Sequence, residues 1–99
     1  MKDGVVSVVA EMVAKPGKEE ELRAELLKML QATRKEAGCI QYDLHAHIDQ
    51  PGRFVFYENW ATVEALERHS KSDHIQAFRA IRGNLLQEDA RVEKYTRIA

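Results

Sequence analysis

The segment from Val5 to Ala14 constrains the fold of this chain more than any other part of the sequence. It is dense in β-branched residues and almost continuously apolar, which is typical of a β-strand buried on both faces. Lys15-Pro16-Gly17 ends the strand. Both faces of the sheet that contains this strand therefore need cover.

A helix is predicted from about Lys18 to Ala37. Acidic residues in its first turn and Arg34 and Lys35 in its last suit the helix dipole, and Gly38 is suited to cap the C-terminus. Residues suited to one buried helix face recur at spacings of three and four: Leu22, Leu26, Met29, Leu30, Thr33 and Ala37.

Two further strands form a predicted hairpin, Cys39 to Ile48 and Arg53 to Ala61, joined by the turn Asp49-Gln50-Pro51-Gly52. The first strand alternates, with Ile40, Tyr42, Leu44, Ala46 and Ile48 on one side. If the turn keeps even-numbered residues together, one face also carries Phe54, Phe56, Glu58 and Trp60, and we assign it to the helices. The opposite face then carries Asp43, His45, His47, Val55, Tyr57 and Asn59.

The rest of the chain completes a split β-α-β-β-α-β pattern. Thr62 begins a short helix that runs to about His69, and Ser72 caps another whose buried stripe is Ile75, Phe78, Ile81 and Leu85. Arg91 to Ile98 alternates as a last strand, with Val92, Lys94, Thr96 and Ile98 on one side. This order predicts a single α+β domain over residues 1–99, ferredoxin-like, with one four-stranded antiparallel sheet and helices on one face. The face left open is expected to be apolar and to form a homodimer.

Charge and cysteine content exclude several classes of partner. Fifteen basic and sixteen acidic residues give a formal charge of -1 without a basic block, so we expect no nucleic acid partner. No run approaches the ~20 apolar residues of a membrane span, so no membrane partner is expected either. Cys39 is the single cysteine, which excludes an intramolecular disulfide and favours the cytoplasm.

Glu58 is the residue that most suggests chemistry. A carboxylate among aromatic side chains would have a raised pKa and could act as a general base near neutral pH, although a hydrogen-bonded structural glutamate would also fit. His69 follows eleven residues later and could pair with Glu58 as a base held in one tautomer, or simply interact with a helix C-terminus. His74 could border the same pocket or be an exposed loop histidine.

Metal and cofactor signals are weak. His45 and His47 point the same way on a strand and could be ligands, but a third ligand would have to come from Asp43 or a partner chain. The sequence contains no glycine-rich phosphate loop, nucleophile elbow or zinc-type cysteine spacing. We therefore expect no metal and no cofactor.

The sequence resembles the antibiotic biosynthesis monooxygenase domain family over nearly its whole length. The resemblance is carried by five segments: Pro16-Gly17, Gly38 to Leu44, Pro51 to Phe54, Tyr57-Glu58-Asn59-Trp60, and Ala65 to His69 followed by Ser72-Asp73-His74 and Phe78. It implies a dimeric α+β barrel with a small apolar pocket between each sheet and its helices. Several relatives are cofactor-free oxygenases of quinols or polycyclic phenols, so the implied substrate is a small aromatic or quinol.

Carried over to this sequence, the resemblance implies roles for seven residues. Glu58 and His69 would assist proton removal, while the substrate would contact Tyr42, Phe56, Trp60, Leu66 and Phe78. His74, at the expected mouth of the pocket, is an eighth candidate for substrate contact. Two other functions stay open: a dimer that binds a small hydrophobic ligand without catalysis, and an isomerase of a small phosphorylated signal molecule. For the isomerase the sequence offers few phosphate ligands beyond Arg53, Arg68 and Arg79.

Overall fold

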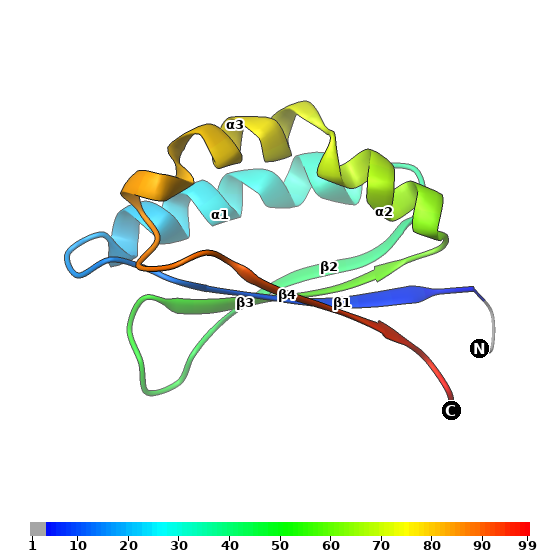
Figure 1. Cartoon of the computed structure of the whole chain (residues 1–99), viewed down its shortest axis with the longest axis horizontal. Coiled ribbons are helices and arrows are strands. Elements are labelled where there is room, and N and C mark those ends of the chain that lie inside the picture. Colours follow the sequence, from blue (N-terminus) through cyan, green and yellow to red (C-terminus); the bar gives the residue numbers. More distant parts are fainter. Residues whose placement is uncertain (1–3) are drawn as a thin grey trace.

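The computed structural model describes residues 4–99 and places three helices on one face of a four-stranded antiparallel sheet (Figure 1). The sheet order is β2-β3-β1-β4, with strands β1 (Val6–Val13), β2 (Cys39–Ala46), β3 (Arg53–Trp60) and β4 (Arg91–Thr96). The helices are α1 (Glu19–Arg34), α2 (Val63–Ser70) and α3 (Asp73–Ile81), followed by a 3-10 turn, η1 (Arg82–Asn84). The predicted ferredoxin-like α+β fold is confirmed.

The predicted register of the hairpin is also confirmed. Tyr42 pairs with Glu58 and Leu44 pairs with Phe56, so the even-numbered residues of β2 and β3 share one face. The even-numbered residues of β3 are buried under the helices. β1 joins the same pattern, because Val8 lies opposite Glu58 and is almost fully buried.

A β-bulge near the start of β2 reverses part of the predicted alternation. Cys39 pairs with Trp60, and the register shifts between Cys39 and Gln41. Because the extra residue interrupts the two-residue period, Ile40 points away from the helices and is 58% exposed. The prediction that Ile40 shares a side with Tyr42 is therefore wrong. Ile48 lies beyond the end of β2 and is also exposed.

Helix α1 ends earlier than predicted. Its last residue is Arg34 and the backbone N–H of Lys35 closes the final turn, so Ala37 lies outside the helix and is exposed. Gly38 is not the cap of α1. It adopts a φ of +85°, and a Cβ added there would lie 2.5 Å from the Cβ of Ala65. The absence of a side chain therefore lets α2 pack directly against the backbone at Gly38.

The capping predictions for the second helical layer are confirmed. The Thr62 hydroxyl accepts a hydrogen bond from the backbone N–H of Ala65 at the start of α2, and the Ser72 hydroxyl accepts one from Ile75 at the start of α3. Phe78 is buried, as predicted, whereas Ile81 is 36% exposed at the end of α3. The predicted stripe is thus wrong at Ile81, where the chain turns into η1.

The opposite face of the sheet carries no helix (Figure 1), and it is less apolar than predicted. Tyr57 and Tyr95 are exposed, but a chain of side-chain hydrogen bonds runs across this face. We call it the polar row: the Ser7 hydroxyl donates to Asn59, whose amide donates to Gln41, whose amide donates to Asp43. The predicted homodimer remains a prediction.

None of the helices in residues 4–99 has both the length and the apolar character needed to cross a membrane.

Candidate functional site

A cavity of about 540 Å³ lies between the sheet and the helices. Its volume is within the usual range for small-molecule sites. Six of the eight residues proposed from sequence line this cavity: Tyr42, Phe56, Glu58, Leu66, His69 and Phe78. The other two, Trp60 and His74, do not line it: Trp60 donates a hydrogen bond to Glu58, and the His74 ring centroid lies 6.0 Å from that of His69.

Two aromatic rings of the sheet, Tyr42 and Phe56, line the cavity together with aliphatic residues of β1. The rings of Tyr42 and Phe56 stack with centroids 4.6 Å apart, and Trp60 packs against His69 at the same centroid distance. Tyr42 also meets the His69 ring edge-on at 5.5 Å. Burial raises the pKa of the Tyr42 phenol, and the nearby Glu58 carboxylate raises it further, so the phenol stays protonated at neutral pH.

Glu58 is a buried carboxyl group on this aromatic surface. Its side chain comes from the helix-facing side of β3, the residue is 4% exposed, and Oε1 accepts a hydrogen bond of 2.9 Å from Trp60 Nε1. Burial raises the pKa of Glu58 to about 7; the Trp60 hydrogen bond opposes this rise and the charge of Glu36 adds to it. Such a carboxyl can accept or release a proton at neutral pH.

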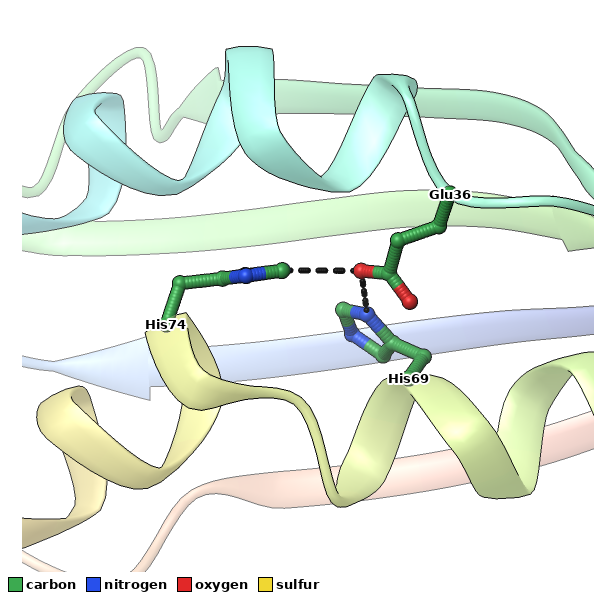
Figure 2. A group of neighbouring side chains, drawn as sticks. All are labelled: Glu36, His69 and His74. Atoms are coloured by element: carbon green, nitrogen blue, oxygen red, sulfur yellow. Dashed lines mark hydrogen bonds and ion pairs between the residues drawn. The ribbon is translucent and has the colours of Figure 1, made fainter.

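His69 is held by a different carboxylate from the one predicted. Its Nδ1 lies 2.8 Å from Glu36 Oε2 (Figure 2), and no hydrogen bond joins Glu58 to His69 in residues 4–99. The prediction that Glu58 fixes the His69 tautomer is therefore corrected to Glu36. Burial lowers the pKa of His69, although the hydrogen bond to Glu36 opposes this. The neutral ring therefore donates from Nδ1 and keeps Nε2 as an acceptor.

Glu36 is the site residue that the sequence analysis missed. It lies just after α1, and its Oε2 is also 2.8 Å from His74 Nε2. The two histidines are 33 and 38 residues away in sequence, so no local motif links them to Glu36. Only the packing of the α2–α3 junction against the end of α1 brings the three together (Figure 2).

His45 and His47, which the sequence suggested as possible metal ligands, belong to no cluster of three possible ligands in residues 4–99. His45 and His47 are both exposed, and His47 Nδ1 accepts hydrogen bonds from the backbone N–H groups of Asp49 and Gln50 in the turn. A group of three potential metal-binding atoms does occur in the described residues, but it consists of Glu36, His69 and His74.

Comparison with known proteins gives a consistent result. The family model described as "Antibiotic biosynthesis monooxygenase" matches residues 5–81. A Mycobacterium tuberculosis protein named "Putative monooxygenase Rv0793" is 38% identical over 81 residues, which cover 82% of this chain and 79% of that protein. The Escherichia coli K12 protein named "Probable quinol monooxygenase YgiN" is 26% identical, over 89% of this chain and 95% of that protein.

Solved structures show the same fold. The crystal structure of PA3566 from Pseudomonas aeruginosa superposes with a TM-score of 0.93 at 33% identity and covers 100% of this chain and 99% of its own. The structure of Rv0793 superposes with a TM-score of 0.91 at 34% identity, with 96% of each chain covered.

Proposed function

Because the chain belongs to the antibiotic biosynthesis monooxygenase family, we propose that it oxidises a small quinol or phenolic aromatic with molecular oxygen, without a metal or flavin. One observation carries this proposal: Glu58, with a pKa of about 7, is buried in an apolar cavity of about 540 Å³. A proton acceptor in such a cavity suits an aromatic substrate whose anion is the reactive species.

The proposed reaction balances without an external reductant. Glu58 takes a proton from one substrate hydroxyl, and the electron-rich anion then reduces oxygen. For a hydroquinone, one oxygen atom becomes a new ring hydroxyl, the other leaves as water, and the organic product is a hydroxyquinone. The substrate supplies both the electrons and the hydrogen atoms of the water, so the Glu58 carboxylate is regenerated.

The neighbouring residues position the substrate. Since Glu36 accepts the hydrogen bond from His69 Nδ1, Nε2 is available to accept one from a second substrate hydroxyl. Tyr42 and Phe56 offer an aromatic surface on which a flat ring can stack. Trp60 acts through Glu58, because its N–H stabilises the ionised carboxylate.

We also propose that the protein works as a homodimer that associates through the helix-free face of the sheet. Exposed Tyr57 and Tyr95 lie on this face together with partly buried Val9 and Val55. Aromatic residues of this kind are enriched at protein interfaces. A partner there would leave the cavity on the helix side unobstructed.

Oxygen uptake with a panel of hydroquinones tests the proposed activity. We expect Glu58→Gln to lower kcat/KM by about 10²–10⁴-fold, the usual contribution of a general base. The matched control is Glu88→Gln, which makes the same change at an exposed loop residue and should leave kcat/KM unchanged. If wild type consumes no quinol, or if Glu58→Gln consumes it as fast as wild type, the proposal is wrong.

Two further measurements, made beside oxygen uptake, distinguish the two other functions. A ligand that raises the melting temperature but returns unchanged from aerobic incubation would indicate a binding protein without catalysis. Conversion of a phosphorylated compound without oxygen uptake would indicate an isomerase.

A further inference from the structure

We propose that Glu36, His69 and His74 form a binding site for a divalent transition-metal cation of the zinc type. The three side chains converge from the end of α1, from α2 and from the start of α3 (Figure 2). Each offers one ligand atom: Glu36 Oε2, His69 Nδ1 and His74 Nε2.

The spacing of these atoms suits coordination of one ion. Oε2 lies 2.8 Å from each of the two nitrogens, and all three atoms lie within 4.8 Å of one another. Nitrogen and oxygen ligands about 2.1 Å from a tetrahedral zinc ion are about 3.4 Å apart from one another. A cation could therefore enter through small side-chain movements, without a change in the backbone.

The ligand types select the class of cation. Two imidazoles and one carboxylate favour zinc, iron, copper or nickel over magnesium and calcium, which prefer oxygen ligands alone. The side chains of His69, Glu36 and His74 are 8%, 17% and 23% exposed, respectively. The site is thus partly shielded from water, and an ion could reach it beside His74.

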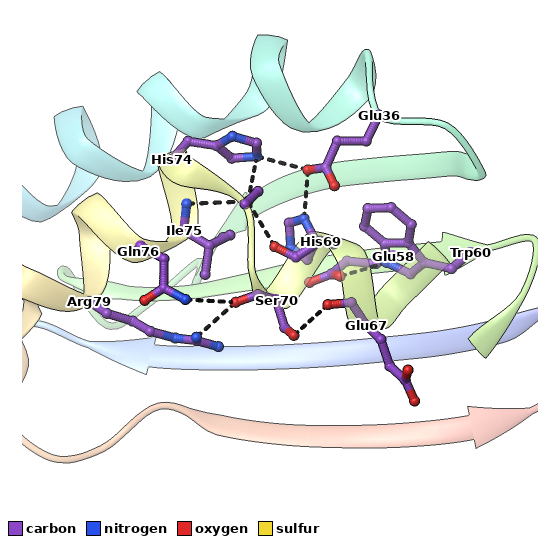
Figure 3. Close-up of polar contacts among 11 residues, drawn as sticks. Glu36, Glu58, Trp60, Glu67, His69, Ser70, His74, Ile75, Gln76 and Arg79 are labelled. Carbon is purple, nitrogen blue, oxygen red and sulfur yellow. Dashed lines mark hydrogen bonds and ion pairs between the residues drawn. The ribbon is translucent and has the colours of Figure 1, made fainter. Parts of the chain in front are cut away.

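Surrounding contacts hold the ligands in place. The indole of Trp60 packs on the His69 ring, and the Ser72 hydroxyl donates to the backbone carbonyl of His69 while lying 3.2 Å from His74 Nε2. Figure 3 shows the hydrogen bond between Trp60 and Glu58 close to this cluster, and the two groups meet where the Trp60 indole packs on the His69 ring. Outer contacts of this kind orient metal ligands and strengthen binding.

Metal binding would change the hydrogen-bonding role of His69. In the metal-free cluster Nδ1 of the neutral ring donates to Glu36, so Nε2 is an acceptor. A cation on Nδ1 needs its lone pair, so the ring proton moves to Nε2, which becomes a donor. This step involves no oxidation or reduction. Nε2 could then no longer accept a hydrogen bond from the substrate, so metal binding would inhibit the proposed oxidation. This inhibition rests on the function proposed above, whereas the metal site itself does not depend on that function.

Cobalt(II) titration of the metal-free, full-length protein tests the site, since bound Co²⁺ absorbs visible light. We expect one Co²⁺ per chain, displaced by Zn²⁺. Glu36→Gln and His74→Gln should each weaken binding at least about tenfold, because each removes one of three ligands. His47→Gln is the matched control at an exposed histidine outside the cluster and should bind Co²⁺ as wild type does.

Several results would overturn this inference. The site is refuted if no Co²⁺ spectrum appears at millimolar cobalt, if both cluster variants bind normally, or if His47→Gln loses binding to the same extent. If Zn²⁺ binds but kcat/KM for a quinol does not change, the proposed tautomer effect is wrong. If no quinol is oxidised under any condition, the Co²⁺ spectra still decide the metal site, so the two proposals fail separately.

Discussion

Replacement of Glu58 by glutamine should stabilise the protein, and the gain should depend on pH. Glutamine keeps the size of the side chain and an oxygen that can accept the hydrogen bond from Trp60 Nε1. It removes the negative charge that burial makes unfavourable. The substitution therefore isolates the free-energy cost of holding an ionised Glu58 in the apolar cavity.

The size of the effect follows from the pKa of this residue. Folding raises the pKa of Glu58 from its ordinary 4.5 to about 7, a difference that corresponds to about 3 kcal/mol. Between these pH values the folded wild type binds more protons than the unfolded chain, so its free energy of unfolding falls as pH rises. Glutamine does not titrate. The gain from Glu58→Gln should therefore be near zero below pH 4.5 and about 3 kcal/mol above pH 7.

Urea denaturation at a series of pH values from 4.5 to 9 measures this difference. The chain concentration must be the same throughout, because association would change the apparent stability. Glu88→Gln serves again as the control, since its exposed side chain carries no comparable burial cost and its effect should be small at every pH.

A difference between wild type and Glu58→Gln that does not change with pH would refute the reasoning. It would mean that Glu58 ionises equally easily in the folded and unfolded chains. A destabilising effect at pH 8 would refute it as well, because it would show that the ionised carboxylate has a favourable partner in the cavity.

Three further predictions concern other parts of the molecule. Trp60→Phe removes the hydrogen bond that lowers the pKa of Glu58, so the acid limb of the kcat/KM profile should move up by about one pH unit. Gly38→Ala should lower the free energy of unfolding by at least about 2 kcal/mol, because this position combines a positive φ with a close approach to α2. Gly17 has a similar φ but open space around it, so Gly17→Ala should lower the free energy of unfolding by only about 1 kcal/mol. Equal losses for the two variants would contradict this account. Light scattering should give about twice the chain mass of 11.4 kDa, and Tyr57→Lys on the open face should give the chain mass itself; a monomeric wild type would rule out the dimer.

The sequence alone predicts most of this fold, because the periodicities that specify it are local. The two-residue period of β2 and β3 predicts that Tyr42 and Glu58 share a face. The errors occur where tertiary contacts override the period. The bulge after Cys39 turns Ile40 outward, and Gly38 serves the approach of α2 rather than the cap of α1.

The candidate site is predictable only in part, for a similar reason. Glu58 stands out because a carboxylate interrupts an aromatic strand, and its place in the cavity follows from strand parity. Glu36 has no such signal. It follows a helix, in a segment rich in charge, and its two histidine partners belong to separate helices. The order of elements along the chain does not say which acidic residue will reach His69.

The polar row on the open face bears on how copies of this chain could recognise one another. Its amides of Gln41 and Asn59 are already hydrogen-bonded to neighbours, and breaking such a bond in a buried interface costs about 1–3 kcal/mol. Because the bonds of the row all lie within one chain, an apolar partner surface could cover them without breaking any of them. The polar row would then be compatible with an apolar interface.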